Sequence, residues 1–146
     1  MRRTLDILMV DDSETDAQLV HTALLASDLP HNLHNVTNGD DALSFLRCEP
    51  PYGHAVRPDL ILLDLNMPEK SGHEVLAEFK ADDDFREIPV IILSTSKSPD
   101  DIRQAYRGYA SSYVTKPMGF DELVDKLAKG LDHYWVGVAE LPPKSS

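Results

Sequence analysis

The fold is decided by the stretch from residue 59 to residue 68, which reads DLILLDLNMP. Its centre, Leu60 to Leu63, is entirely apolar, as expected for a strand that is covered on both faces of a parallel sheet. The apolar run stops at Asp64, so a carboxylate stands where the strand ends. In open parallel sheets the chemistry lies beyond the carboxyl ends of the strands. The stretch therefore predicts an α/β domain with Asp64 at its functional edge.

Strand-like and helix-like segments alternate along the rest of the chain. Further strands are predicted at Leu5–Val10, Asn32–Val36, Val90–Leu93 and Ser112–Thr115. Helices are predicted after the capping residues Ser13, Ser71 and Ser98, over Asp40–Arg47 and over Phe120–Tyr134. Such alternation with right-handed crossovers predicts a flavodoxin-like, doubly wound five-stranded parallel sheet in the order 2-1-3-4-5.

Some details of these helices are predicted from local patterns. Ser13 and Asp16 have the spacing of a capping box, in which the two residues satisfy each other's backbone N–H groups. Leu25 is expected to continue the apolar face of the first helix, and Tyr109 that of the fourth. The histidines are scattered without an acidic cluster beside them, so they are interpreted as surface residues rather than metal ligands.

Length and composition limit the class of protein. The 146 residues suit one domain, which we expect over residues 1–141, with a flexible tail at 142–146. The formal net charge of −11 disfavours binding to nucleic acid or to anionic membranes. Cys48 is the only cysteine, and the first apolar run is too short for a signal peptide or a membrane span. These features predict a cytoplasmic protein that contacts neither nucleic acid nor membrane.

Polar residues follow four of the predicted strands. They are Asp11 and Asp12 after the first strand, Asp64 after the third, Ser94 and Thr95 after the fourth, and Lys116 after the fifth. Taken singly, each has an ordinary explanation: an acid beside a helix N-terminus, a turn residue, a loop hydroxyl or a solvent-exposed lysine. Together they predict one site, because the carboxyl ends of parallel strands meet at the same edge of a sheet.

Three neighbouring carboxylates repel each other unless a cation neutralises them. Oxygen ligands without clustered His or Cys favour Mg²⁺ over Zn²⁺, and Mg²⁺ also accepts phosphate oxygens as ligands. Lys116 adds a positive charge suited to an anion. The residues therefore predict a Mg²⁺ site that handles a phosphoryl group.

This set of residues resembles the receiver domains of bacterial response regulators, and the resemblance covers nearly the whole chain. It rests on Asp11-Asp12, on Asp64-Leu65-Asn66-Met67-Pro68, on Ser94 and on Lys116-Pro117. The resemblance implies a phosphoprotein of a two-component phosphorelay. In that family a sensor histidine kinase or a phosphotransfer protein donates the phosphoryl group. The domain catalyses its own Mg²⁺-dependent phosphoryl transfer and dephosphorylation, without being a conventional turnover enzyme.

The same resemblance assigns a role to each site residue. Asp64 is the implied phosphoacceptor, with Lys116 and Ser94 as catalytic partners. Asp12 and Asp64 would bind Mg²⁺ directly, Asp11 would act through water, and Asn66 would contribute its backbone carbonyl. Ser94 and Tyr113 would form the switch that reports phosphorylation to a downstream protein target. Thr95 is often smaller in the family, so we expect it to narrow access to the phosphoryl group.

The end of the chain, from His133 to Val138, resembles the single-domain regulators associated with phytochromes. A run rich in aromatic and aliphatic residues at this point exceeds what one helix can bury. We therefore expect a homodimer through the fourth helix, the fifth strand and the last helix, with contacts from Tyr134–Leu141. The alternative is that this run folds back onto its own domain.

Three other functions are alternatives to the receiver. A phosphohydrolase with an aspartyl nucleophile would need a second acid two residues after the first, where this chain has Asn66. A receiver that binds proteins without being phosphorylated would not need the complete set of acidic and basic residues. A flavodoxin-type electron carrier would need backbone donors and little negative charge after the first strand. The receiver that is phosphorylated fits best.

Overall fold

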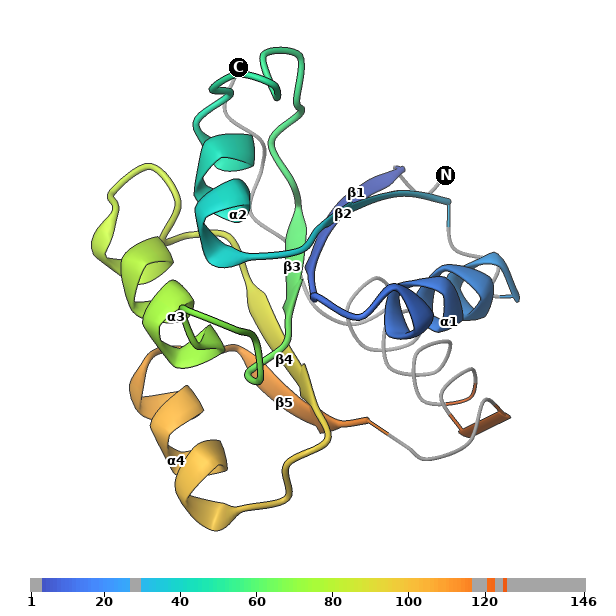
Figure 1. Ribbon diagram of the computed structural model, residues 1–146, viewed down its shortest axis with the longest axis vertical. Helices are drawn as coiled ribbons and strands as arrows, with labels where there is room; N and C mark the ends of the chain where they lie inside the picture. The colour runs from blue at the N-terminus through green and yellow to red at the C-terminus, as the bar shows by residue number, and fades with distance from the viewer. Residues whose placement is uncertain (1–3, 27–29, 117–120, 123–124, 126–146) are drawn as a thin grey trace.

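A parallel sheet forms the centre of the protein. The computed structural model describes residues 4–26, 30–116, 121–122 and 125. Within these residues the strands are β1 (Leu5–Val10), β2 (His31–Val36), β3 (Leu60–Leu63), β4 (Val90–Ser94) and β5 (Ser112–Thr115). All neighbouring strands are parallel, and their order is β2-β1-β3-β4-β5 (Figure 1). The predicted order 2-1-3-4-5 is confirmed.

The register of the strands aligns their carboxyl ends. Val10, the last residue of β1, pairs with Val36 at the end of β2 and with Leu63 at the end of β3. The next residues, Asp11 and Asp64, therefore leave the sheet at the same level. This register brings together acids that lie far apart in the sequence.

Four helices connect the described strands. They are α1 (Glu14–Ala26), α2 (Gly39–Leu46), α3 (Gly72–Ala81) and α4 (Pro99–Arg107). The predicted caps Ser71 and Ser98 are confirmed, since each side chain accepts a hydrogen bond from a backbone N–H in the first turn. α2 begins one residue earlier than predicted, because Asn38 caps it by accepting from Asp41 N–H at 2.8 Å.

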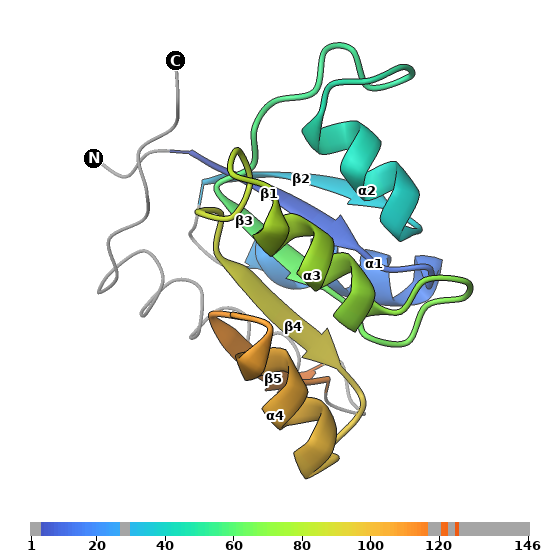
Figure 2. The ribbon, with the colours of Figure 1, turned by 90° about the vertical axis from the view of Figure 1, so that its left-hand side faces the viewer.

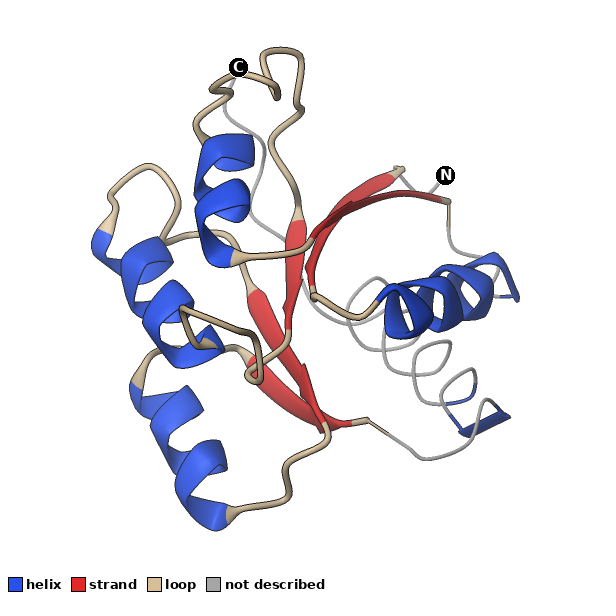
Figure 3. Ribbon diagram, in the orientation of Figure 1, coloured by secondary structure: helices blue, strands red, loops and turns tan. Residues whose placement is uncertain are grey.

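The helices cover both faces of the sheet, with α1 on one side and α2, α3 and α4 on the other (Figures 1 and 3). Alternate residues of a strand point to opposite faces. Ile7 and Met9 accordingly share a buried cluster with Leu24 of α1. Leu8 and Val10 belong to the cluster on the other face. Because both faces are buried, the inner strands need the continuous apolar runs seen in the sequence.

Two predictions about helix residues are wrong. Leu25 is 63% exposed, because it lies about 100° around α1 from Leu24, which faces the sheet. Tyr109 lies beyond α4, which ends at Arg107; its φ of 71° is left-handed and its side chain is 75% exposed. The predicted last helix lies largely outside the described residues, and the Tyr134–Leu141 extension and the tail at 142–146 lie wholly outside them.

Each crossover returns the chain to the amino end of the next strand, so the loops that leave the strands share one edge. Figure 2 shows the strands running in the same direction, with the start of α4 following the tip of β4. Among the described residues, we find no helix with the length and hydrophobicity needed to cross a membrane.

Candidate functional site

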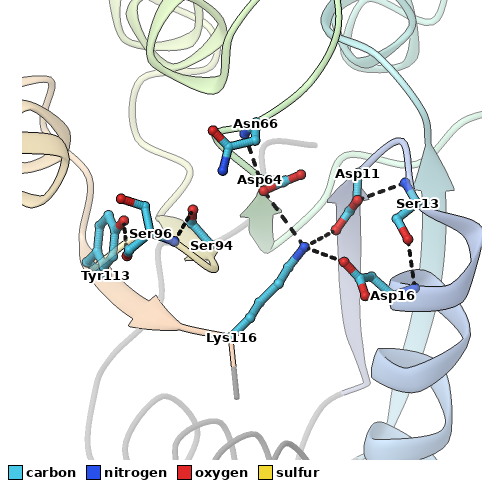
Figure 4. Close-up of polar contacts among 9 residues, drawn as sticks. All are labelled: Asp11, Ser13, Asp16, Asp64, Asn66, Ser94, Ser96, Tyr113 and Lys116. Atoms are coloured by element: carbon cyan, nitrogen blue, oxygen red, sulfur yellow. Dashed lines mark hydrogen bonds and ion pairs between the residues drawn. The ribbon is translucent and has the colours of Figure 1, made fainter. Parts of the chain in front are cut away.

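The site lies at the carboxyl edge of the sheet, where β1, β3, β4 and β5 end (Figure 4). Backbone hydrogen bonds extend the strand pairing beyond the strands themselves. Asp64 N–H donates to Val10 C=O at 3.0 Å, and Lys116 N–H donates to Ser94 C=O at 2.7 Å. These bonds hold the backbone of Asp64 beside Val10, the residue before Asp11, and hold the backbone of Lys116 beside Ser94 at the end of β4.

The predicted acidic residues do come together. Asp11, Asp12 and Asp64 each offer a carboxylate oxygen, and these oxygens lie within 4.8 Å of one another. Asp11 and Asp64 are buried, whereas Asp12 is exposed. Three carboxylates at this spacing, without His or Cys, fit a hard divalent cation such as Mg²⁺ or Mn²⁺. The exposed Asp12 leaves a side from which such an ion can enter.

Lys116 supplies the positive charge among these acids. Its Nζ lies 2.7 Å from Asp11 Oδ2, 2.8 Å from Asp16 Oδ2 and 3.7 Å from Asp64 Oδ1. The side chain is only 9% exposed. Burial alone would lower the pKa of Lys116, but its hydrogen bonds to Asp11 and Asp16, together with the negative charges of Asp11 and Asp64, raise that pKa above its ordinary value. The lysine therefore stays charged and partly neutralises the pocket.

Asp16 is a site residue that the sequence patterns did not reveal. Its backbone N–H donates to Ser13 Oγ at 3.2 Å, as a capping box requires, but its carboxylate binds Lys116 instead of Ser13. Asp11 Oδ1 accepts from Ser13 N–H at 2.9 Å and so completes the cap in its place. This exchange frees Asp16 to act as a fourth carboxylate of the pocket.

The chemistry of Asp64 follows from its surroundings. Burial raises the pKa of the Asp64 carboxyl to about 6; Lys116 opposes this rise, and Asp11 adds to it. At neutral pH the group is mostly ionised and thus able to act as a nucleophile. Because the folded chain binds this proton more tightly than the unfolded chain does, ionisation of Asp64 costs stability above pH 6. That cost disappears as the pH falls from about 6 toward 4.

We expect divalent-cation affinity to depend steeply on pH below about 6. A proton on Asp64 competes with the metal, so the affinity of Mg²⁺ should fall by about tenfold for each pH unit below that point and level off above it. Calorimetric Mg²⁺ titrations at several pH values measure this. In Asp64→Asn the affinity should be weaker above pH 6 and its dependence on pH flatter. If the Mg²⁺ affinity of that variant depended on pH just as steeply, the competing proton would belong to another group.

Close packing positions the loop that carries Asp64. Gly72 N–H, at the start of α3, donates to Leu65 C=O at 3.0 Å. A Cβ at position 72 would overlap the backbone of Asp64 and Leu65, so only glycine fits there. Asn66 N–H donates to Asp64 Oδ1 at 3.4 Å, while the side chain of Asn66 is exposed. The loop thus holds the Asp64 carboxylate from its own backbone.

The predicted switch residues are connected through Ser96. Ser94 is completely buried, and its Oγ accepts a hydrogen bond from Ser96 N–H at 3.2 Å. The Tyr113 hydroxyl donates to Ser96 C=O at 2.8 Å, and the ring packs against the buried cluster. Thr95, between the two serines, is exposed. Ser94 and Tyr113 therefore contact the same segment, the loop between β4 and α4.

The chain is similar to known proteins in sequence and in fold. Residues 7–128 match the family described as the response regulator receiver domain. Response regulator Rcp1 of Synechocystis sp. is 40% identical over 136 residues, which are 93% of this chain and 92% of Rcp1. Its Mn²⁺-bound crystal structure superposes with a TM-score of 0.85 at 39% identity, covering 95% of this chain and 99% of that one. The phosphorylated cyanobacterial phytochrome response regulator RcpA gives a TM-score of 0.88 at 42% identity, covering 97% and 100%.

Proposed function

Since the chain belongs to the response regulator receiver family and acts in two-component phosphorylation signalling, we propose that Asp64 is the residue that accepts the phosphoryl group. The observation that carries this assignment is the position of Asp64. It is a buried carboxylate within 4.8 Å of two other acids, and its Oδ1 lies 3.7 Å from the Lys116 ammonium. A phosphoryl group on Asp64 Oδ1 would therefore lie close to the positive charge of Lys116, which would stabilise it.

The transfer we propose is a direct displacement at phosphorus. An oxygen of ionised Asp64 forms the new P–O bond while the bond between phosphorus and the donor's imidazole nitrogen breaks, and that nitrogen keeps the electron pair. Such transfers need alignment and charge neutralisation more than proton shuttling. Lys116 supplies the charge, and the loop from Asp64 to Gly72, closed by the Gly72 N–H to Leu65 C=O hydrogen bond, supplies the alignment.

We propose Mg²⁺ as the bound cation, held directly by Asp12 and Asp64, through water by Asp11, and by the backbone carbonyl of Asn66. The cluster of oxygen donors and the Mn²⁺-bound form of Rcp1 support a divalent metal. When bound, the cation neutralises the charge that develops on the phosphoryl oxygens. Asp11 already bonds Ser13 and Lys116, which supports its indirect role.

Incubation with acetyl phosphate and MgCl₂, followed by intact-mass measurement, tests this function. We expect the mass to increase by one phosphoryl group and to return slowly to its starting value. Omission of Mg²⁺ is the control and should prevent the increase. The proposal would be contradicted if the mass increased neither with acetyl phosphate nor with a phosphorylated kinase domain. A phosphohydrolase would instead consume the donor rapidly without a lasting increase in the mass of the protein.

The related proteins suggest the partner. We propose a cytoplasmic phytochrome-type sensor histidine kinase as the donor, because Rcp1 and RcpA match nearly the whole chain and RcpA is described as a phytochrome response regulator. We propose that residues 1–141 act as one receiver unit that passes the signal to another protein. The net charge of −11 argues against direct binding to nucleic acid.

We expect Asp16→Asn to raise the rate of phosphorylation by about threefold. Asp16 competes with the phosphoryl group for Lys116, so removal of its charge lets the lysine move toward Asp64 at lower cost. The measurement is the rate of mass increase with acetyl phosphate at saturating Mg²⁺. Glu14→Gln, an exposed acid in the same helical turn, is the matched control and should leave the rate unchanged. A slower Asp16→Asn variant would instead show that Asp16 helps to bind the metal.

We propose that phosphorylation favours a symmetric dimer through the face of α4, β5 and the last helix. Tyr106 in the last turn of α4 and Tyr109 between α4 and β5 are 49% and 75% exposed. Sedimentation with and without acetyl phosphate should show a larger species after phosphorylation. Tyr106→Ser should weaken that species, whereas Leu25→Ser on α1 should not. A monomer under all conditions would contradict this proposal.

A further inference from the structure

His73 is a histidine whose surroundings the sequence did not predict. It was interpreted as a surface residue, but its side chain is only 15% exposed and lies between α3 and α4. Its Nε2 lies 3.4 Å from Asp101 Oδ1, and its Nδ1 is buried without a partner among the described residues. A carboxylate only accepts hydrogen bonds, so Nε2 carries the proton. The one polar contact of the ring is therefore directed at Asp101.

Asp101 connects His73 to the loop between β4 and α4. Its other oxygen, Oδ2, accepts from Ser96 Oγ at 2.6 Å, the shortest hydrogen bond in this region. The hydrogen bonds from Ser96 and His73 lower the pKa of Asp101, as expected for a carboxylate that stays ionised with both oxygens occupied. Asp101 is thus held from α3 by His73 and holds Ser96 in turn.

Ser96 contacts every part of the switch. Its N–H donates to Ser94 Oγ, and its C=O accepts from the Tyr113 hydroxyl (Figure 4). Its own Oγ also accepts from Ser98 N–H at 3.2 Å, at the cap of α4. A displacement of Ser96 would therefore move the Ser94 hydroxyl and release Tyr113. The backbone N–H and C=O of Ser96 thus each form a hydrogen bond with a switch residue.

We propose that His73 and Asp101 are positioning residues for phosphorylation: by holding Ser96, they fix the Ser94 hydroxyl and the Tyr113 ring where the phosphoryl group requires them. This inference rests on the proposed function of Asp64. Among the described residues, Asp101 bonds Ser96 directly and His73 reaches Ser96 through Asp101. Fixing donors before the reaction lowers the cost of organising them during it.

The first test uses nuclear magnetic resonance on unphosphorylated protein without metal. His73→Phe and Asp101→Asn should each shift the Ser96 amide resonance and the Tyr113 ring resonances. His73→Gln keeps an N–H directed at Asp101 and should restore the parent positions. Asp100→Asn is the matched control, because Asp100 lies in the same turn and pairs with the exposed Arg103 instead of with the switch loop. Unchanged resonances in both His73→Phe and Asp101→Asn would overturn the proposal.

The second test is a double-mutant cycle on the phosphorylation rate. We expect His73→Phe and Asp101→Asn each to slow phosphorylation by about threefold, with no further slowing in a Ser96→Ala background. Mg²⁺ affinity and melting temperature should stay close to those of Asp100→Asn. Slowing of the same size with and without Ser96 Oγ would overturn the proposal. If the parent accepts no phosphoryl group, the proposed function fails, whereas the resonance test separately shows whether His73 and Asp101 hold Ser96.

Discussion

Asp64→Asn will leave the protein unable to accept a phosphoryl group, while the sheet and its helices remain intact. The substitution changes one oxygen to nitrogen, so the volume of the buried side chain is almost unchanged. It removes the nucleophile, and the amide cannot form an acyl phosphate with a donor. Intact-mass measurement after incubation with acetyl phosphate and Mg²⁺ should show no increase, against full labelling of the parent.

The stability of this variant provides an independent check. Because burial raises the pKa of Asp64, its ionised form costs the folded protein free energy at neutral pH. Asp64→Asn should therefore melt at the same temperature as the parent or higher, when both lack metal. Labelling of Asp64→Asn at full stoichiometry would place the acceptor on another residue. A large loss of stability would show instead that the missing label reports unfolding.

The fold was accessible from the sequence because its signals are local. The apolar run of β3 ends at Asp64 within the sequence itself, and the bounds predicted for β1, β3 and β5 are confirmed. The strand order followed from the alternation of strands and helices together with the handedness of crossovers. The convergence of Asp11, Asp12, Asp64 and Lys116 followed in turn, because parallel strands end at one edge.

The remaining features depend on contacts between distant residues. Asp16 has the spacing of a capping residue, and its pairing with Lys116 joins positions 100 residues apart. His73 meets Asp101 only because α3 and α4 pack side by side. Gly72 approaches Asp64 through a turn whose geometry does not follow from residue types alone. Sequence patterns report which face of an element is apolar, but they do not report which polar side chains share that face.

Lys116→Ala should destabilise the metal-free protein by about 3 kcal/mol at pH 8. Asp11 is 1% exposed and bonds the lysine at 2.7 Å, so the substitution leaves a buried carboxylate without its cation, a loss of this order in other proteins. Asp64 and Asp16 lose the same partner. Lys116→Arg keeps the charge and should lose less. Chemical denaturation of the three proteins measures the differences.

The dependence of this stability loss on pH and on Mg²⁺ distinguishes the loss of a positive charge from a simple packing defect. Lys116 holds the pKa of Asp64 down in the parent, so Asp64 of Lys116→Ala should take up its proton at a higher pH, and the gap in stability between the two proteins should narrow as the pH falls from 8 toward about 6. Added Mg²⁺ supplies the missing positive charge and should also narrow it. Phosphorylation should remain measurable in the variant, but without the backbone chemical-shift changes of the phosphorylated parent, because the phosphoryl group lacks its fixed cationic partner. A gap that is independent of both pH and Mg²⁺ would mean that Lys116 stabilises the protein through its aliphatic chain alone.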